Sequence, residues 1–160
     1  MTHVLVLLLA LLIGVVAGLR ALTPPAVVAW GAFLGWLNLS DTWVSWLGNW
    51  ITVTVLTILL VVELVTDQLP KTPSRKTTAQ FATRLITGGF AGAAIGTAWG
   101  YTLGGLGAGV IGAVLGTLGG YEARSRLVKA NGGRDLPVAL VEDVIAVGGG
   151  FLVVYLTSVL

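Results

Sequence analysis

Long apolar runs recur along the whole chain and are separated by short polar segments. A transmembrane helix needs about 20 mostly apolar residues, and most of the runs are close to that length. The pattern predicts an all-α protein, a polytopic transmembrane helix bundle of about six spans. The expected spans are residues 4–19, 24–38, 50–69, 78–100, 103–123 and 136–160. They fill the chain, so we expect one integral membrane domain over residues 1–160 and no soluble domain.

The second span is the least regular of the six. It begins at Pro24-Pro25, and proline suits the first turn of a helix because the amide donor that it lacks would have no partner there. The run is short, however, and apolar runs of about 10–14 residues usually fail to cross a bilayer. Both a crossing helix and a re-entrant helix therefore fit residues 24–38. The first run, Val4 to Gly18, has no basic residue before it, so we expect a retained span and not a signal peptide.

The composition of the chain indicates a lipid environment. Hydrophobic residues make up 56 % of the chain and charged residues 10 %, with a mean hydropathy of +0.94. Soluble domains carry about 25 % charged residues, so this chain could not cover itself with a polar surface. The net charge of +2 and the pI near 9.3 could suggest nucleic acid, but the basic residues stand beside apolar spans, where they set topology. We therefore expect the lipid bilayer as a partner and no nucleic acid.

The basic residues predict an orientation. With six crossings, all nine Lys and Arg residues fall on one side of the membrane. They are Arg20, Lys71, Arg75, Lys76, Arg84, Arg124, Arg126, Lys129 and Arg134. Because cytoplasmic loops are enriched in Lys and Arg, this side is predicted to be cytoplasmic and both termini external, in the inner (plasma) membrane of the cell. If the second span were re-entrant, only Arg20 would be misplaced.

Aromatic residues independently favour the same topology. They map to the predicted external side, where amphipathic rings suit the boundary between lipid and water. These residues are Trp36, Trp43, Trp46, Trp50, Trp99, Tyr101 and Tyr155. The connection over residues 40–46 holds two of them among polar residues, which favours a short helix lying in the interface.

The sequence excludes several kinds of chemistry. The chain has no cysteine, which excludes disulfides, thiol catalysis and cysteine metal sites. His3 is the single histidine, so a multi-histidine metal site is also excluded. An intramembrane enzyme that acts on lipid head groups ranks last among the hypotheses, because no nucleophile–base pair or lipid-enzyme signature is present. We expect no enzyme activity and no cofactor, and the sequence identifies no particular metal ion.

Glycine dominates the fourth and fifth spans. A four-residue spacing leaves a bare groove along one helix face, and this groove lets another backbone come close. The glycines are Gly88, Gly92, Gly96 and Gly100 in the fourth span, and Gly105, Gly109, Gly112, Gly116 and Gly120 in the fifth. The pattern predicts that these two spans form the tightest contact, either within one chain or across the interface of a homo-oligomer. A pore lining or a sliding surface is the functional alternative.

Charged residues at membrane depth are the main functional signal. Glu63, Arg84 and Glu142 each lie about 9–10 Å inside the cytoplasmic end of a span, at about 1.5 Å per residue. A charge at such a depth costs at least ~2.5 kcal/mol unless it is paired or hydrated, so these side chains should face inward and converge. The neighbouring charged residues in this layer are Arg20, Asp67, Glu122 and Asp143.

Two interpretations of the charged layer remain open. In the structural interpretation, Arg84 pairs with Glu63 or Glu142 and fixes the bundle. In the functional interpretation, the layer lines a polar cavity for a small solute or ion, with candidate binding residues Arg20, Glu63, Asp67, Arg84, Glu142 and Asp143. The segment 20–25 is similarly open: it fits a plain turn, and it also fits an anion site because free amides at a helix start meet Arg20 there.

Three segments and the glycine pattern carry a resemblance to a known family. The segments are 18–25 (GLRALTPP), 63–70 (ELVTDQLP) and 137–143 (PVALVED). Over nearly its whole length the chain resembles a family of small bacterial membrane proteins catalogued as domain of unknown function 4126, a resemblance that implies no activity. A weaker resemblance is to cation exchangers with a Glu-x-Gly-Asp-Lys-Thr signature. The chain departs from that signature, because Glu63 and Asp67 are four residues apart instead of three and Gln68 replaces the lysine.

The residues therefore support two hypotheses about function. The first is a small transporter or channel, expected to be a homo-oligomer, that uses the charged layer as its site for an ion or small solute. The second is a non-catalytic membrane scaffold or assembly protein in which the charges form a structural ion-pair network.

Overall fold

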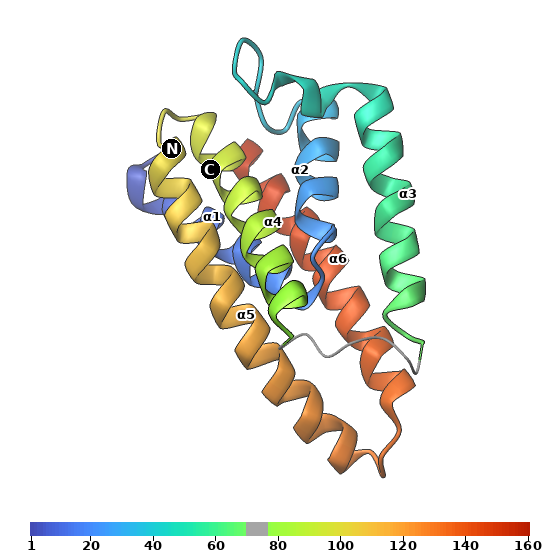
Figure 1. The fold of residues 1–160 in the computed structure, drawn as a ribbon. Coiled ribbons are helices and arrows are strands. Elements are labelled where there is room, and N and C mark those ends of the chain that lie inside the picture. The colour runs from blue at the N-terminus through green and yellow to red at the C-terminus, as the bar shows by residue number, and fades with distance from the viewer. Residues whose placement is uncertain (70–76) are drawn as a thin grey trace.

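A computed structural model of the protein describes residues 1–69 and 77–160. Within these residues the chain is helical and contains no strand, so the all-α prediction is confirmed for this part of the protein (Figure 1). The elements are α1 (His3–Leu19), α2 (Thr23–Phe33), a short 3₁₀-helix (Ser45–Gly48), α3 (Trp50–Thr66), α4 (Thr78–Thr97), α5 (Thr102–Ala130) and α6 (Asp135–Val159).

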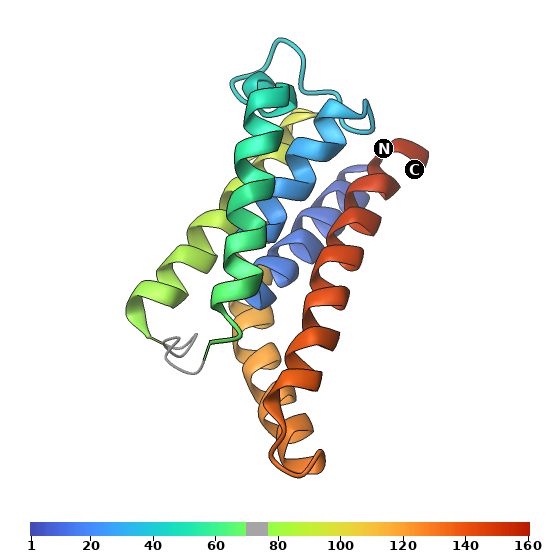
Figure 2. The same ribbon diagram turned by 90° about the vertical axis from the view of Figure 1, so that its right-hand side faces the viewer.

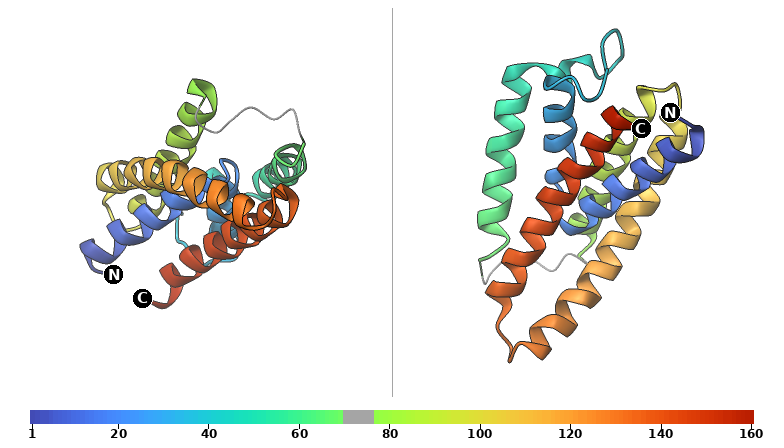
Figure 3. Two further views of the ribbon diagram at one scale, coloured as in Figure 1. Left: turned by 90° about the horizontal axis from the view of Figure 1, so that it is seen from below. Right: turned by 180° about the vertical axis from the view of Figure 1, so that it is seen from behind.

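The two chain termini lie near one end of the bundle, which we call the termini end (Figures 1 and 2). The α2–α3 and α4–α5 connections lie at the same end. The turn between α5 and α6 lies at the opposite end, the hairpin end, where these two helices extend past the others (Figure 1). Seen from behind, α1 lies along α5, and this contact is the most extensive between any two helices in residues 1–69 and 77–160 (Figure 3).

Two helices are long and apolar enough to cross a membrane, judged by length and composition. They are α5, with 29 residues, and α6, with 25. Helices α1 and α3 are also apolar but have 17 residues each. Many large apolar side chains of these four helices are exposed on the outside of the bundle.

Local sequence signals account for several helix ends. The Asn49 side chain accepts a hydrogen bond from the amide of Ile51 at 2.9 Å and so caps the start of α3. Pro24 and Pro25 stand in the first turn of α2, as the sequence predicts. After α5, Gly132 and Gly133 have φ of 68° and 82°, a left-handed conformation that glycine adopts without strain.

Several predicted boundaries differ from the structure. Helix α2 ends at Phe33 instead of residue 38, because the chain turns at Gly35, where φ is 77°. Helix α5 continues to Ala130 instead of 123, since no proline or turn-forming glycine interrupts it before residue 132. The expected interfacial helix over 40–46 is limited to a 3₁₀-turn at Ser45–Gly48, and α3 ends at Thr66 instead of 69. The predicted stop at Pro70 and the basic residues Lys71, Arg75 and Lys76 lie outside the described residues.

Helix α5 uses glycines on two faces. Toward α4, a Cβ atom on Gly92 would overlap the carbonyl oxygen of Gly105, and one on Gly109 would overlap that of Gly88. Toward α1, a Cβ atom on Gly112 would overlap the carbonyl oxygen of Leu11. The close contact predicted for the fourth and fifth spans is therefore present. It is not the largest one, because α1 packs against α5 even more extensively.

Some glycines differ from the prediction. Gly14 and Gly18 of α1, which the sequence analysis did not single out, approach Gly109 and Gly116 of α5. Gly100 does not extend the row of α4, because it lies in the turn after that helix with φ of 78°.

Helices α2, α3 and α6 meet through larger side chains. Val27 of α2 and Val154 of α6 are fully buried and pack against Gly150 and Gly31 of the facing helix. The indole nitrogen of Trp30 donates a 2.9 Å hydrogen bond to the Thr57 hydroxyl, which joins α2 to α3. Only Val53 and Leu60 of α3 are buried, so this helix lies at the edge of the bundle.

Candidate functional site

Arg20 is at the centre of the candidate site. It lies in the non-helical break between α1 and α2, and its side chain is only 1 % exposed. Its Nε donates to Asp143 Oδ1 at 2.5 Å, and its Nη1 lies 3.3 Å from Asp67 Oδ2. Its Nη2 lies 3.8 Å from Glu142 Oε2. One guanidinium group therefore joins the break to α6 and to the end of α3.

A second arginine extends this arrangement along α5 and α6. Arg124 donates to Glu142 Oε2 at 3.1 Å. It also forms a two-bond contact with Asp135, at 2.9 and 2.7 Å. We call the residues joined by these ion pairs the charged network: Arg20, Asp67, Arg124, Asp135, Glu142 and Asp143.

Gln68 orients one member of the network. Its amide nitrogen donates to Asp143 Oδ2 at 2.8 Å, so the two oxygens of Asp143 are held by Gln68 and by Arg20. The sequence analysis did not select Gln68, Arg124 or Asp135 as site residues. A fifth span drawn to residue 130 would have identified Arg124 and Asp135. Arg124 then lies inside a helix that faces α6.

Glu63 of α3 occupies the amide groups at the start of α2. Its two carboxylate oxygens accept hydrogen bonds from the amides of Ala21 and Leu22, at 2.7 and 2.8 Å. The free amides of a helix start favour a negative charge. Of the two interpretations left open for the segment 20–25, the anion site has an occupant in the structure, which is a side chain of the protein itself.

Arg84 of α4 has the opposite role at the end of α1. It is 3 % exposed, and its Nη1 donates to the carbonyl of Gly18 at 2.9 Å and to that of Ala17 at 3.4 Å. A cation is stabilised at the carbonyl end of a helix. Arg84 also interacts electrostatically with Glu63. The two helix ends that meet at the break are thus neutralised by side chains of opposite sign.

Most of the residues predicted for the charged layer lie around this break. Arg20, Asp67, Glu142 and Asp143 share ion pairs, with Arg20 rather than Arg84 at the centre. Glu122 lies apart from them, since it is exposed and pairs with Arg126 one turn along α5. The described residues hold no group of three or more His, Cys, Asp or Glu side chains that could bind a metal ion.

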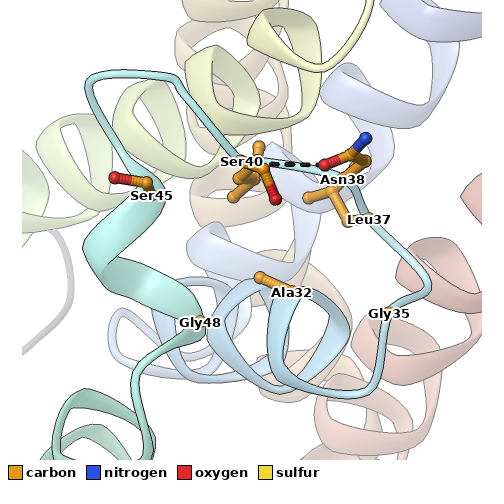
Figure 4. Close-up of a pocket in the computed structure, with 8 residues that line it drawn as sticks. Ala32, Gly35, Leu37, Asn38, Ser40, Ser45 and Gly48 are labelled. Carbon is orange, nitrogen blue, oxygen red and sulfur yellow. Dashed lines mark hydrogen bonds between the residues drawn. The ribbon is translucent and has the colours of Figure 1, made fainter.

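A pocket of about 440 Å³ lies at the termini end (Figure 4). The residues that line it come from the end of α2 and the connection that follows: Ala32, Gly35, Leu37, Asn38, Leu39, Ser40, Ser45 and Gly48. The Asn38 side chain accepts a 3.1 Å hydrogen bond from the Ser40 amide at its rim. The lining is polar but carries no charge, and the sequence analysis did not predict this pocket.

Comparison with known proteins gives one match. The model of the family described as Domain of unknown function (DUF4126) matches residues 7–158, so the chain belongs to this family. The resemblance stated from the sequence is therefore confirmed. No curated protein and no solved structure matches the chain.

Proposed function

We propose that this member of the DUF4126 family is a small integral membrane transporter or channel for a cation or a proton. The distribution of side chains supports the membrane location. Val55, Ile58 and Val144 are at least half exposed, whereas Arg20 and Arg84 are almost fully buried. Soluble proteins place most charged side chains in water and bury large apolar ones, whereas this chain buries several charged side chains and exposes many large apolar ones, as expected of a protein surrounded by lipid.

The proposed topology has six membrane helices and both termini external, in the inner membrane. Both termini near one end of the bundle agree with an even number of helices (Figure 2). Helix α2, with 11 residues, is about 17 Å long and reaches only part of the way through a hydrocarbon core of about 30 Å. In this proposal α1 and α2 enter from the external side, and the break between them lies within the membrane.

The buried break at Arg20 is the observation that carries the proposal. Transporters commonly bind their ions where interrupted helices end inside the membrane, and ionisable groups at that depth are functional by default. Around this break the described residues include more carboxylates than guanidinium groups, which favours a cation or a proton over an anion. The carboxylates are Glu63, Asp67, Glu142 and Asp143, and the guanidinium groups are Arg20, Arg84 and Arg124.

Flux through proteoliposomes tests this function. The panel comprises protons, Na⁺, K⁺ and small organic acids, and the informative variant is Asp67→Asn. When Asp67 is neutralised, Arg20 loses one contact at 3.3 Å but keeps its contacts with Asp143 and Glu142, so the fold should stay intact. We expect flux to fall at least tenfold while the melting temperature changes little. Glu122→Gln, which neutralises an exposed carboxylate outside the charged network, is the matched control and should keep full flux.

A membrane scaffold is the second candidate, because every charged side chain described at the break has a structural partner. Glu63 and Arg84 hold helix ends, and Arg20 holds three carboxylates. Absence of flux for the whole panel, with Asp67→Asn only lowering the melting temperature, would favour the scaffold. The glycine rows that suggested a homo-oligomer pack within one chain, so neither candidate function depends on an oligomer.

A further inference from the structure

The hairpin end of α5 and α6 extends beyond the thickness of a membrane core. Helix α5 has 29 residues and is therefore about 43 Å long, whereas the hydrocarbon core is about 30 Å thick. About 20 residues after Thr102 the helix reaches Tyr121, which is exposed. Residues 121–138, which we call the hairpin tip, would then lie among the lipid head groups.

Two basic residues of the hairpin tip have no acidic partner within the described residues. Lys129 and Arg134 are exposed and form no ion pair there. The other two arginines of the tip differ, because Arg124 is bound to Asp135 and Arg126 to Glu122. Lys129 and Arg134 flank the turn at Gly132 and Gly133, whose left-handed conformation brings the two helices back together.

An apolar groove of about 350 Å³ lies beside these charges. Its lining comes from the hairpin tip and the next turn of α6: Leu127, Ala130, Asn131, Pro137, Val138 and Val141. Leu127 and Val141 are each more than half exposed. Exposed apolar surface next to unpaired positive charge complements a ligand that joins a hydrocarbon chain to an anionic head group.

We propose that the hairpin tip binds an anionic phospholipid. Its acyl chain lies in the groove, and its phosphate contacts Lys129 and Arg134. Each basic residue near an anionic lipid surface contributes binding energy, whereas a zwitterionic lipid has no net charge to attract it. The inference rests on the membrane location proposed above and does not depend on transport.

Lipid binding to the purified full-length protein tests the proposal. Native mass spectrometry would compare retention of phosphatidylglycerol with that of phosphatidylcholine, and thermal unfolding would be followed with each lipid added. The double variant Lys129→Gln/Arg134→Gln should bind phosphatidylglycerol about thirtyfold more weakly and lose its preference over phosphatidylcholine. Arg126→Gln removes an arginine that is already paired with Glu122, so this control should keep most of the binding.

Two further measurements distinguish binding of the acyl chain from binding of the phosphate alone. Val138→Trp fills the groove and should reduce phosphatidylglycerol retention without changing the net charge. Inorganic phosphate alone should not raise the melting temperature, because it lacks the acyl chain. Equal retention of both lipids by the wild-type protein would overturn the proposal, and so would unchanged binding in the double variant. Failure of transport with lipid preference intact would refute the proposed function and leave this inference standing.

Discussion

Helices α1, α4 and α5 meet through glycines, and helices α2, α3 and α6 meet through larger apolar, polar and charged side chains. In the first group, backbones approach so closely that a Cβ atom on Gly92, Gly109 or Gly112 would overlap a carbonyl oxygen of the next helix. In the second group, Arg20 reaches from the break to α3 and α6 through ion pairs. Both groups are well buried at their centres, but they are held together by different forces.

The difference concerns how much rearrangement each group permits. Glycine contacts depend on close packing of two backbones. This packing allows one arrangement, and an added side chain disrupts it. Ion pairs and carboxylate–amide bonds depend on protonation and on partner choice, both of which can change without a change in backbone path. We therefore regard α1, α4 and α5 as the fixed frame, and the break with α2, α3 and α6 as the part that the proposed function would require to respond to an ion.

The largest expected effect is the loss of folding when the packing of α1, α4 and α5 is disrupted. A Cβ atom on Gly109 would overlap the carbonyl oxygen of Gly88, so leucine at this position would collide with the backbone of α4. We expect Gly109→Leu to abolish folding, with a loss of about 3 kcal/mol or more. Gly107→Leu in the same helix is the control, because a side chain there meets open space. Monodispersity on size-exclusion chromatography and thermal unfolding measure both variants; a normal melting temperature for Gly109→Leu would contradict the described packing.

The second effect concerns the charged network. Arg20→Gln leaves Asp143, Asp67 and Glu142 without their shared cation, and removing one partner of a buried ion pair costs about 3–5 kcal/mol. Thermal unfolding in detergent measures the loss. Arg126→Gln, whose side chain is 78 % exposed, should change stability by less than about 1 kcal/mol.

A compensating substitution sharpens this test. Adding Asp143→Asn to Arg20→Gln removes the carboxylate that lies closest to the guanidinium, so part of the lost stability should return. If the double variant were no more stable than Arg20→Gln, the coupling between the break and α6 would not be electrostatic.

Features carried by one segment were largely predictable from the sequence. The apolar runs predicted helices, because each helix has to bury or expose its own apolar face. Glycine rows predicted close packing for α4 and α5. The packing of α1 against α5 was harder to predict. Gly14 and Gly18 of α1 are a weak signal in a leucine-rich run, and sequence spacing does not say which helix lies opposite.

Features that depend on relative depth were less predictable. The sequence gives depth only relative to the end of each span, so it predicts Arg20, which precedes the second span, at the border of the charged layer. In the structure the α1–α2 break lies inside the bundle, well above the α5–α6 turn (Figure 1). Arg20 therefore reaches Asp143 and Glu142, whose positions along α6 were counted correctly. The sequence identified the acidic residues and misjudged which arginine they share.

The smallest expected effect compares one threonine from each group. Thr117 of α5 and Thr23 of α2 are fully buried, and neither hydroxyl has a hydrogen-bond partner in the part of the chain that the structure describes. Removing an unsatisfied buried hydroxyl while keeping the shape of the side chain is neutral or stabilising. Thr117 follows Gly116, and a Cβ atom on Gly116 would overlap the backbone of α1 at Val15. The contact between α1 and α5 therefore leaves no room for another molecule beside Thr117.

The two valine variants should therefore differ in their effects on stability and on flux. Thr117→Val should raise stability by up to about 1 kcal/mol and leave flux unchanged. Thr23 directly follows Leu22, whose amide holds Glu63, so under the proposed function its hydroxyl would lie next to an ion or water bound at the break. Thr23→Val should lower flux and give no gain in stability, whereas Thr23→Ser keeps the hydroxyl and should restore flux. Thermal unfolding and proteoliposome flux measure the pair, and an equal gain in stability from both valines would mean that the break is as closed to solutes as the glycine frame.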